Sequence, residues 1–133
     1  MENAKLRSET MRAVKSKDTG PEKIVRSIVH GLGFRFRLHR KDLPGNPDLV
    51  FPRLKKVVFV HGCFWHGHRC ARGDRVPVHN RAYWVDKIKR NRQRDQNAAR
   101  LLRKLGWERK VIWECSLKNP EQVKSYLVKF LRD

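Results

Sequence analysis

Residues 61–70, which read HGCFWHGHRC, constrain this chain more than any other segment. They place three histidines and two cysteines around the adjacent aromatic residues Phe64 and Trp65. A buried strand does not usually carry three histidines beside an arginine, and a solvated loop does not usually carry two large aromatic side chains in succession. The segment therefore has the composition of a functional site.

The charge of the chain indicates a polyanionic partner. Thirty-two lysines and arginines outweigh thirteen acidic residues, which gives a formal net charge of +19 and a pI of about 10.8. Nucleic acid is the first candidate, because the basic residues extend over the whole chain. An anionic membrane surface is the alternative, but no apolar run approaches the roughly 20 residues that span a bilayer. We therefore expect no membrane partner.

Length and local composition predict one folded domain that follows a basic arm. A chain of 133 residues is large enough for a single hydrophobic core. Residues 1–20 are polar and mostly basic, so we expect a flexible arm that becomes ordered on DNA, and residues 21–133 form the predicted domain. The N-terminus lacks the apolar stretch of a secretory signal, which predicts an intracellular protein with reduced thiols.

Hydrophobic periodicity predicts an α/β protein. A helix begins at Pro21, where proline is tolerated in the first turn. A very basic helix is expected over residues 81–105, and a last helix begins after the N-cap residue Asn119. Strands are predicted at residues 34–38, 48–51, 57–60 and 111–113. The order of these elements indicates a mixed central sheet flanked by helices.

Three cysteines and one histidine form a candidate zinc site. Cys63, His68 and Cys70 are close in sequence, and Cys115 follows the last predicted strand. Three cysteines cannot all pair with one another, whereas three thiolates and one imidazole complete a tetrahedral zinc shell. A closed shell of this kind is structural, so zinc would hold the residues between its ligands rigid. The alternative is that the cysteines are small buried hydrophobic residues.

Four titratable residues form a candidate catalytic site. Asp48 lies at the start of one predicted strand, while His61 and His66 lie at and just beyond the end of the next. A carboxylate at a strand edge can bind Mg²⁺, and a neutral imidazole can take a proton from water near physiological pH. Glu22, in the first turn of the first helix, is placed to orient a histidine or a metal-bound water. Together these residue types suit phosphodiester hydrolysis.

Four motifs in this order resemble the very short patch repair (Vsr) DNA mismatch endonucleases. They are LPGNPDLV at 43–50, VFVHGCFWH at 58–66, YWVDKI at 83–88 with Asn91, and LGW at 105–107 with IWEC at 112–115. The resemblance implies a fold like that of type II restriction endonucleases, with one endonuclease domain over residues 21–133. It also implies a Mg²⁺-dependent nick on the 5′ side of the thymine in a T:G mismatch, which arises when 5-methylcytosine deaminates.

The same resemblance implies roles for the candidate catalytic residues. Asp48 matches the aspartate that binds Mg²⁺, His66 the histidine that activates water, and His61 its companion near the scissile phosphate. Glu22 matches an acidic residue that supports the histidines. Val60 stands where threonine is common in the family, and would bind Mg²⁺ through its main-chain carbonyl. The four candidate zinc ligands match structural zinc ligands.

Several further residues are implied to contact DNA. Phe64 and Trp65 match side chains that enter the duplex from the major groove beside the mismatch, with Trp84 as a further member of this wedge. Inserted rings restore part of the stacking that is lost when a base step opens. Met11, on the N-terminal arm, matches a residue that enters from the minor groove. The remaining positions matched near the mismatch are Lys87 and Asn91.

Two alternatives remain open. One is a zinc-stabilised DNA-binding module without catalysis, which would have no need of Asp48, His61 and His66. The other is a nuclease for another mismatch or another DNA structure. A nicking enzyme needs one site, so we expect a monomer. The resemblance further implies a bacterial cytoplasmic protein, associated with the nucleoid during repair, and a MutL-like mismatch-repair partner.

Overall fold

The computed structural model describes residues 19–66, 68, 70 and 76–132. The predicted basic arm, including Met11, thus lies almost entirely outside the described residues. Within them the elements are α2 (Gly20–Gly31), β1 (Arg37–Leu38), β2 (Leu49–Phe51), β3 (Lys56–His61), α3 (Arg81–Lys104), β4 (Glu108–Trp113), a 3-10 turn (Glu114–Lys118) and α4 (Pro120–Arg132). The predicted α/β class and element order are confirmed. No helix in this part of the chain is both long and apolar enough to cross a bilayer.

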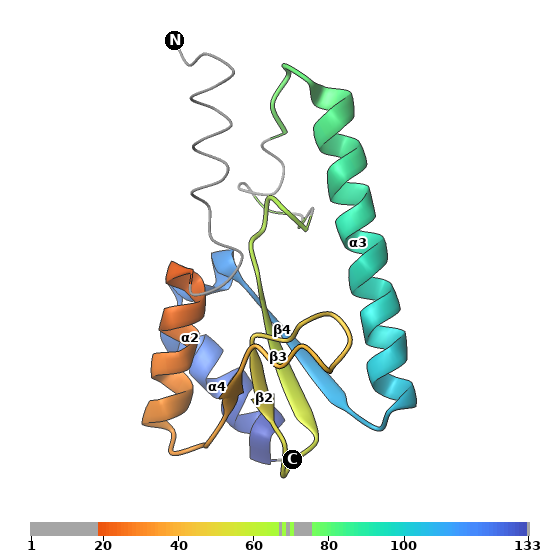
Figure 1. Ribbon diagram of the computed structural model, residues 1–133. Coiled ribbons are helices and arrows are strands. Elements are labelled where there is room, and N and C mark those ends of the chain that lie inside the picture. The colour runs from red at the N-terminus through yellow and green to blue at the C-terminus, as the bar shows by residue number, and fades with distance from the viewer. Residues whose placement is uncertain (1–18, 67, 69, 71–75, 133) are drawn as a thin grey trace.

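The sheet is mixed, as predicted. Its strand order is β1-β2-β3-β4, with antiparallel pairing from β1 to β3 and parallel pairing between β3 and β4. In Figure 1, α2 and α4 lie on one side of the sheet and α3 stands on the other. Because of this pairing, the start of β2 lies beside the ends of β3 and β4, at one end of the sheet. We call this end of the sheet its site edge.

Helix α2 presents one stripe of side chains to the core. Thr19 caps the helix, since its hydroxyl accepts a hydrogen bond from Glu22 N at 3.3 Å, and Pro21 occupies the first turn. Val25 and Val29 are fully buried, and Glu22 is only 2% exposed. The spacing of these three residues places them on one face of the helix. A carboxylate therefore enters the interior on the apolar face of α2.

Alternation along β3 decides which helix each of its side chains meets. Val58 belongs to the core cluster shared with α2 and α4, whereas Val57 and Phe59 belong to the cluster that contains Leu102 of α3. Because successive side chains of a strand point to opposite faces, His61 continues the row that faces α3. The alternation of β3 therefore directs the His61 side chain toward α3.

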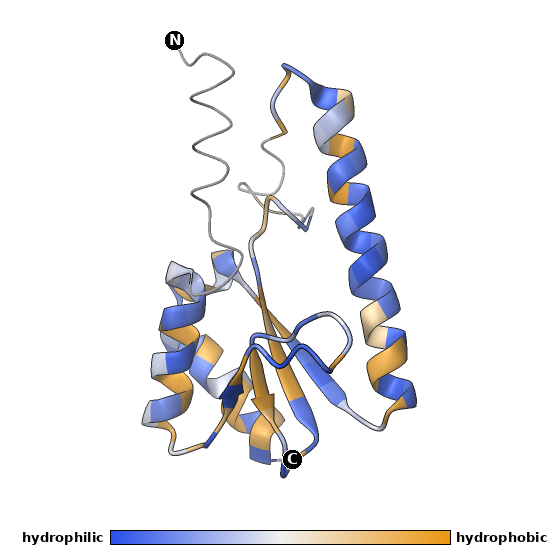
Figure 2. Ribbon diagram, viewed as in Figure 1, coloured by the Kyte–Doolittle hydropathy of each residue, from blue (hydrophilic) through white to orange (hydrophobic). Residues whose placement is uncertain are grey.

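Helix α3 is long but only partly packed. Of its 24 residues, the buried ones are Trp84, Ile88, Ala98 and Leu102. Figure 2 shows that its middle turns are hydrophilic and that it extends past the sheet. The helix therefore offers a largely basic, solvated surface beside the sheet edge.

A glycine permits the turn before β2 to lie against α3. Gly45 has a φ of +80°, and a Cβ built on it would lie 2.7 Å from the Cβ of Ala98 and 3.1 Å from Phe59 Cε1. Any side chain would meet both strain and collision there. Gly45 thus lets the segment that leads to Asp48 approach the sheet edge closely.

The two middle strands differ from their predicted bounds by one residue at one or both ends, and the first and last strands differ by three residues at their start. The first was predicted at 34–38, but only Arg37 and Leu38 pair with β2, and the preceding Phe34 and Phe36 pack against the core instead. The last begins at Glu108 and not at residue 111. Its first three residues are charged and carry no apolar signal, yet they pair with β3 through the backbone, which is independent of side-chain type.

Candidate active site

Asp48 is held at the end of β3 by one hydrogen bond of its backbone and one of its carboxylate. Asp48 N donates to Val58 O at 3.1 Å, and Val60 N donates to Asp48 Oδ2 at 2.6 Å. Since Val60 immediately precedes His61, these bonds bring the carboxylate close to the strand end that carries the histidine. The backbone therefore positions Asp48 independently of any ligand.

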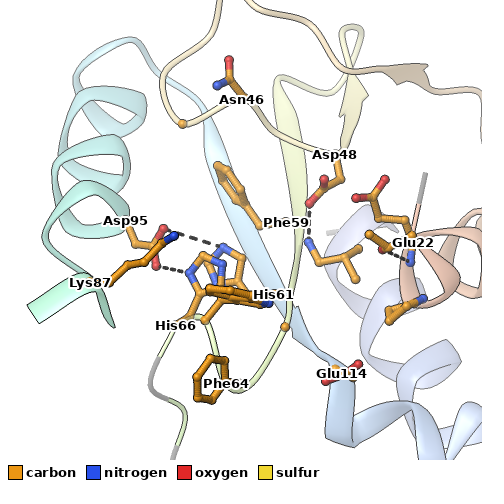
Figure 3. A pocket seen from close by; sticks show the side chains of 16 residues that line it. Glu22, Asn46, Asp48, Phe59, His61, Phe64, His66, Lys87, Asp95 and Glu114 are labelled. Atoms are coloured by element: carbon orange, nitrogen blue, oxygen red, sulfur yellow. Dashed lines mark hydrogen bonds and ion pairs between the residues drawn. The ribbon is translucent and has the colours of Figure 1, made fainter. Parts of the chain in front are cut away.

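A cavity of about 620 Å³ opens at this edge of the sheet. Figure 3 shows Asp48 and Glu22 on one side of it and His61, His66 and Asp95 on the other. The polar and aromatic residues that line it are Thr19, Glu22, Asn46, Asp48, Phe59, His61, Phe64, Trp65, His66, Lys87, Asp95 and Glu114. All four candidate catalytic residues, and Val60, thus border one space.

The two histidines form a stacked pair that is anchored by Asp95. The rings of His61 and His66 lie 3.8 Å apart and are parallel to within 2°. His66 Nδ1 is 2.6 Å from Asp95 Oδ2, and His61 Nε2 is 4.0 Å from Asp95 Oδ1. Because a carboxylate only accepts hydrogen bonds, His66 Nδ1 carries the proton and Nε2 is the basic nitrogen.

His61 is held in its neutral form. Burial and, secondarily, the neighbouring His66 lower the pKa of His61 to about 4, against the opposing pull of Asp95. Its Nδ1 atom is buried and has no hydrogen-bond partner among the described residues. A buried polar nitrogen without a partner is energetically costly, and such atoms are uncommon outside functional sites.

Asp95 is a site residue that the sequence did not predict. It lies in the middle of α3, where most neighbouring residues are charged and no apolar stripe shows which face is inward. The available signal was indirect. The alternation of β3 directs His61 toward α3, and Asp95 is one of only two acidic residues in that helix.

Glu22 lies on the Asp48 side of the cavity (Figure 3), which suits the expected role beside a metal-bound water and not the expected role beside a histidine. The resemblance implied an acidic residue that supports the histidines, but Glu22 lies beside Asp48, and its carboxylate contacts Arg26 at 3.1 Å. Asp95 is the carboxylate in contact with His66. The physical reason is that α2 packs on the opposite face of the sheet from α3.

The Asp48 side of the cavity has the features of a cation site. Burial and the neighbouring Glu22 raise the pKa of Asp48 to about 7, although the hydrogen bond from Val60 N opposes this shift. Glu22, His39 and Asp48 each offer one ligand atom, and these atoms lie within 4.8 Å of one another. A divalent cation would relieve the repulsion between the two carboxylates. The residues present therefore fit an oxygen-preferring metal.

The four predicted zinc ligands converge. Cys63, His68, Cys70 and Cys115 offer ligand atoms within 4.8 Å of one another, and all three cysteines are free thiols. Burial, helped by the adjacent Cys115 and Cys70 thiols, raises the pKa of Cys63 to about 12. Three sulfurs and an imidazole gathered this closely suit a metal that stabilises thiolates, so the donor set fits zinc.

Stacked rings connect this cluster to the histidine pair. The His68 ring stacks on Trp113 at 4.1 Å, and the Trp113 ring meets His61 edge-on at 5.1 Å. Trp113 ends β4 directly opposite His61 in the sheet register. Trp113 thus lies between the candidate zinc cluster and the histidine pair and contacts both.

The predicted aromatic wedge forms one cluster. The rings of Phe64 and Trp65 lie 5.1 Å apart, and both contact Trp84, at 5.6 and 5.9 Å. Phe64 and Trp65 are half-buried, whereas Trp84 is 7% exposed and lies behind them. Lys87 Nζ lies 5.2 Å over the Trp65 ring, and Asn91 Nδ2 donates to Trp65 O at 2.9 Å. Lys87 and Asn91 therefore support the aromatic side chains.

The chain is similar to known nicking enzymes over most of its length. A family model described as DNA mismatch endonuclease Vsr matches residues 2–72. The Type II nicking enzyme V.XorIIP of Xanthomonas oryzae pv. oryzae is 55% identical over 80% of this chain and 78% of its own. The Type II nicking enzyme V.NmeAIP of Neisseria meningitidis is 41% identical over 96% and 90%, and the DNA mismatch endonuclease Vsr of Escherichia coli is 40% identical over 88% and 74%. This chain therefore belongs to the Vsr family of DNA mismatch endonucleases.

Proposed function

We propose that the protein is a Mg²⁺-dependent endonuclease that nicks one DNA strand on the 5′ side of the thymine in a T:G mismatch. Its family makes it a phosphodiester-hydrolysing DNA endonuclease. The observation that carries the finer proposal is the cavity that combines a buried carboxylate with the histidine pair, beside half-buried aromatic rings. A DNA-binding module without catalysis would have no use for this combination.

His66 is the proposed general base. Its Nε2 takes a proton from water while the water oxygen attacks phosphorus and the bond to the leaving oxygen breaks. Asp95, hydrogen-bonded to Nδ1, stabilises the imidazolium that results and fixes the ring orientation. His61, neutral and stacked against His66, completes the wall that faces the phosphate.

The proposed Mg²⁺ ligands are Asp48 and the main-chain carbonyl of Val60, with Glu22 beside them. Mg²⁺ bound there would neutralise charge on the scissile phosphate and on the departing oxygen. Asp48 supplies the carboxylate in a fixed orientation, because its second role is to accept the hydrogen bond from Val60 N. The substitution of valine for threonine leaves a carbonyl ligand unchanged.

Zinc has a structural role in this proposal, and the aromatic cluster provides mismatch recognition. Cys63, His68, Cys70 and Cys115 would bind zinc and hold the segment that carries the wedge and His66. Phe64 and Trp65 would enter the opened base step, with Trp84 behind them, and Met11 would enter from the opposite groove. A mismatched step opens more easily than a matched one, which supports the preference for T:G.

The proposed partners follow from the same activity. The substrate is double-stranded DNA, which suits a net charge of +19. We propose a monomer that acts at the bacterial nucleoid, with a MutL-like protein as repair partner.

A duplex with a central T:G pair should be nicked 5′ of the thymine in the presence of Mg²⁺. The matched duplex should react at least about 100-fold more slowly, because opening a paired step costs a few kcal/mol more. End-mapping of labelled strands over randomised flanking sequences measures the site and the preference together. Binding without a nick in every context would contradict the enzyme proposal, and efficient nicking of matched DNA would contradict the mismatch proposal.

Replacing Asp95 with asparagine should lower the nicking rate by about 100-fold or more while DNA affinity stays unchanged. Asparagine keeps the shape of the side chain but removes the charge that stabilises protonated His66. Single-turnover nicking rates, with DNA affinity measured in Ca²⁺, separate the two effects. Asp86→Asn is the matched control, because Asp86 lies on the same helix but is exposed and paired with Arg90. Equal rates for both variants would remove Asp95 from the mechanism.

A further inference from the structure

We propose that His39 is a positioning residue of the active site, which fixes Glu22 beside Asp48 by holding Arg26 in place. The proposal rests on the proposed function, since it adds a residue to the same site. His39 belongs to none of the sequence motifs that indicated catalysis, and no role for it follows from the zinc site or the wedge.

The backbone brings His39 to the site edge at an energetic cost. The antiparallel register pairs Leu38 with Leu49, so the next residues, His39 and Asp48, lie across from one another where the two strands separate. His39 has a φ of +52°, in the left-handed region, which is unfavourable for a residue other than glycine. Its side chain is only 24% exposed, so the function of this residue is to be sought in the contacts of its ring.

The contacts of the ring supply that function. Arg26 Nη2 lies 2.9 Å from His39 Nε2, and the same Nη2 donates to Glu22 Oε2 at 3.1 Å. A guanidinium group has donors only, so His39 Nε2 is the acceptor and the ring proton lies on Nδ1. One arginine nitrogen thus bridges the imidazole and the buried carboxylate. His39 holds the arginine, and the arginine holds Glu22.

A second role for His39, as a direct cation ligand, is less consistent with these contacts. Its nitrogen does lie within 4.8 Å of ligand atoms of Glu22 and Asp48. However, the Arg26 guanidinium already contacts both His39 Nε2 and Glu22 Oε2, so a cation on Nε2 would meet a permanent positive charge. Mg²⁺ also prefers oxygen ligands. The cation is therefore expected on the Asp48 side, and His39 acts through Arg26.

Loss of the acceptor should weaken Mg²⁺ binding. Without His39, Arg26 loses one of the acceptors that orient its guanidinium group, so its contact with Glu22 holds that carboxylate less firmly beside Asp48. Outer partners of metal ligands typically contribute about 10- to 100-fold in metal affinity or activity. We expect an effect of this size on the Mg²⁺ concentration needed for half-maximal nicking.

The first test compares His39→Gln with His39→Met. The two side chains have nearly the same length and the same backbone cost at this φ, but only the glutamine amide oxygen can accept from Arg26. His39→Gln should keep a nearly normal Mg²⁺ requirement, whereas His39→Met should raise it about 10-fold or more. The increase in melting temperature that Mg²⁺ causes, measured without DNA, should be nearly normal in His39→Gln and smaller in His39→Met. This second readout does not depend on nicking, so failure of the proposed function would not obscure it.

The second test separates the ring from the turn. His39→Gly removes both the imidazole and the backbone strain, and Lys55→Gly relieves the same strain at φ +52° in the exposed turn between β2 and β3. Lys55→Gly should nick like the wild type, and His39→Gly should resemble His39→Met. The proposal is overturned if His39→Gly behaves like Lys55→Gly, or if the glutamine and methionine variants have the same Mg²⁺ requirement. A wild-type protein that does not nick T:G DNA, but shows the expected order of Mg²⁺-induced stabilisation, would refute the proposed function alone.

Discussion

Replacing Asp48 with asparagine should abolish nicking and at the same time stabilise the metal-free protein. Burial and Glu22 raise the pKa of Asp48 from 3.8 to about 7, so between these values the folded state binds a proton that the unfolded chain has released. Stability therefore falls as pH rises through this window. Asparagine does not ionise, and its amide oxygen can still accept from Val60 N. Above pH 7 the variant should be more stable by a few kcal/mol, while the nicking rate falls at least about 1000-fold.

Thermal unfolding at pH 5 and pH 8, with and without Mg²⁺, measures the stability effect. The wild type should gain more from Mg²⁺ at pH 8 than at pH 5, because the proton competes with the cation for Asp48, and the variant should gain little at either pH. Asp42→Asn is the control: Asp42 is exposed, and its hydrogen bond with Arg40 lowers its pKa. That variant should nick normally and should not be stabilised. A variant at position 48 that nicks, or that loses stability at pH 8 without cation, would contradict the assignment.

The secondary structure could be predicted where neighbouring residues carry a clear signal for a helix end or a strand. Thr19 and Pro21 mark the start of α2, and the β-branched run before His61 marks the central strand β3. The same approach failed for the first half of β4, because Glu108–Lys110 pair through backbone groups alone. A parallel pairing partner is set by tertiary structure, which a local pattern does not contain.

The site was predictable in part for a similar reason. The number and spacing of the cysteines predicted the four residues of the candidate zinc cluster, since three thiols and one nearby histidine match a known coordination shell. Asp95 was missed because it is one charged residue on a hydrophilic helix, and only the packing of α3 against β3 brings it to His66. His39 was missed because its importance depends on register and on a backbone angle.

Two separately packed parts of the fold organise the cavity. The carboxylate half of the cavity is organised by α2 and the β1–β2 edge, through Glu22, Arg26 and His39. The histidine half is organised by α3 and the candidate zinc cluster, through Asp95 and Trp113. Strand β3 contributes to both halves through Val60 and His61, so the site depends on these last two residues of the strand keeping their positions between α2 and α3.

Removal of the proposed zinc ion should therefore inactivate the enzyme by disturbing the histidine half, because the role proposed for zinc is structural and not catalytic. His68→Ala should lower the free energy of unfolding by several kcal/mol and reduce nicking to background. The variant loses one candidate zinc ligand, and it also loses the ring that stacks on Trp113, which in turn contacts His61. Metal content, the melting temperature and nicking of T:G DNA measure the effect.

Reconstitution distinguishes this structural role from a catalytic one. Protein stripped with a chelator and then freed of it should recover nicking with Zn²⁺ and Mg²⁺ together, but not with either ion alone. His79→Ala is the matched control, because His79 is exposed just before α3 and lies outside the clustered ligands. It should retain zinc, stability and activity. Full activity in Mg²⁺ after complete removal of zinc would show that the cysteine cluster holds no metal that the histidines need, and Trp113 would then have to keep His61 in position by packing alone.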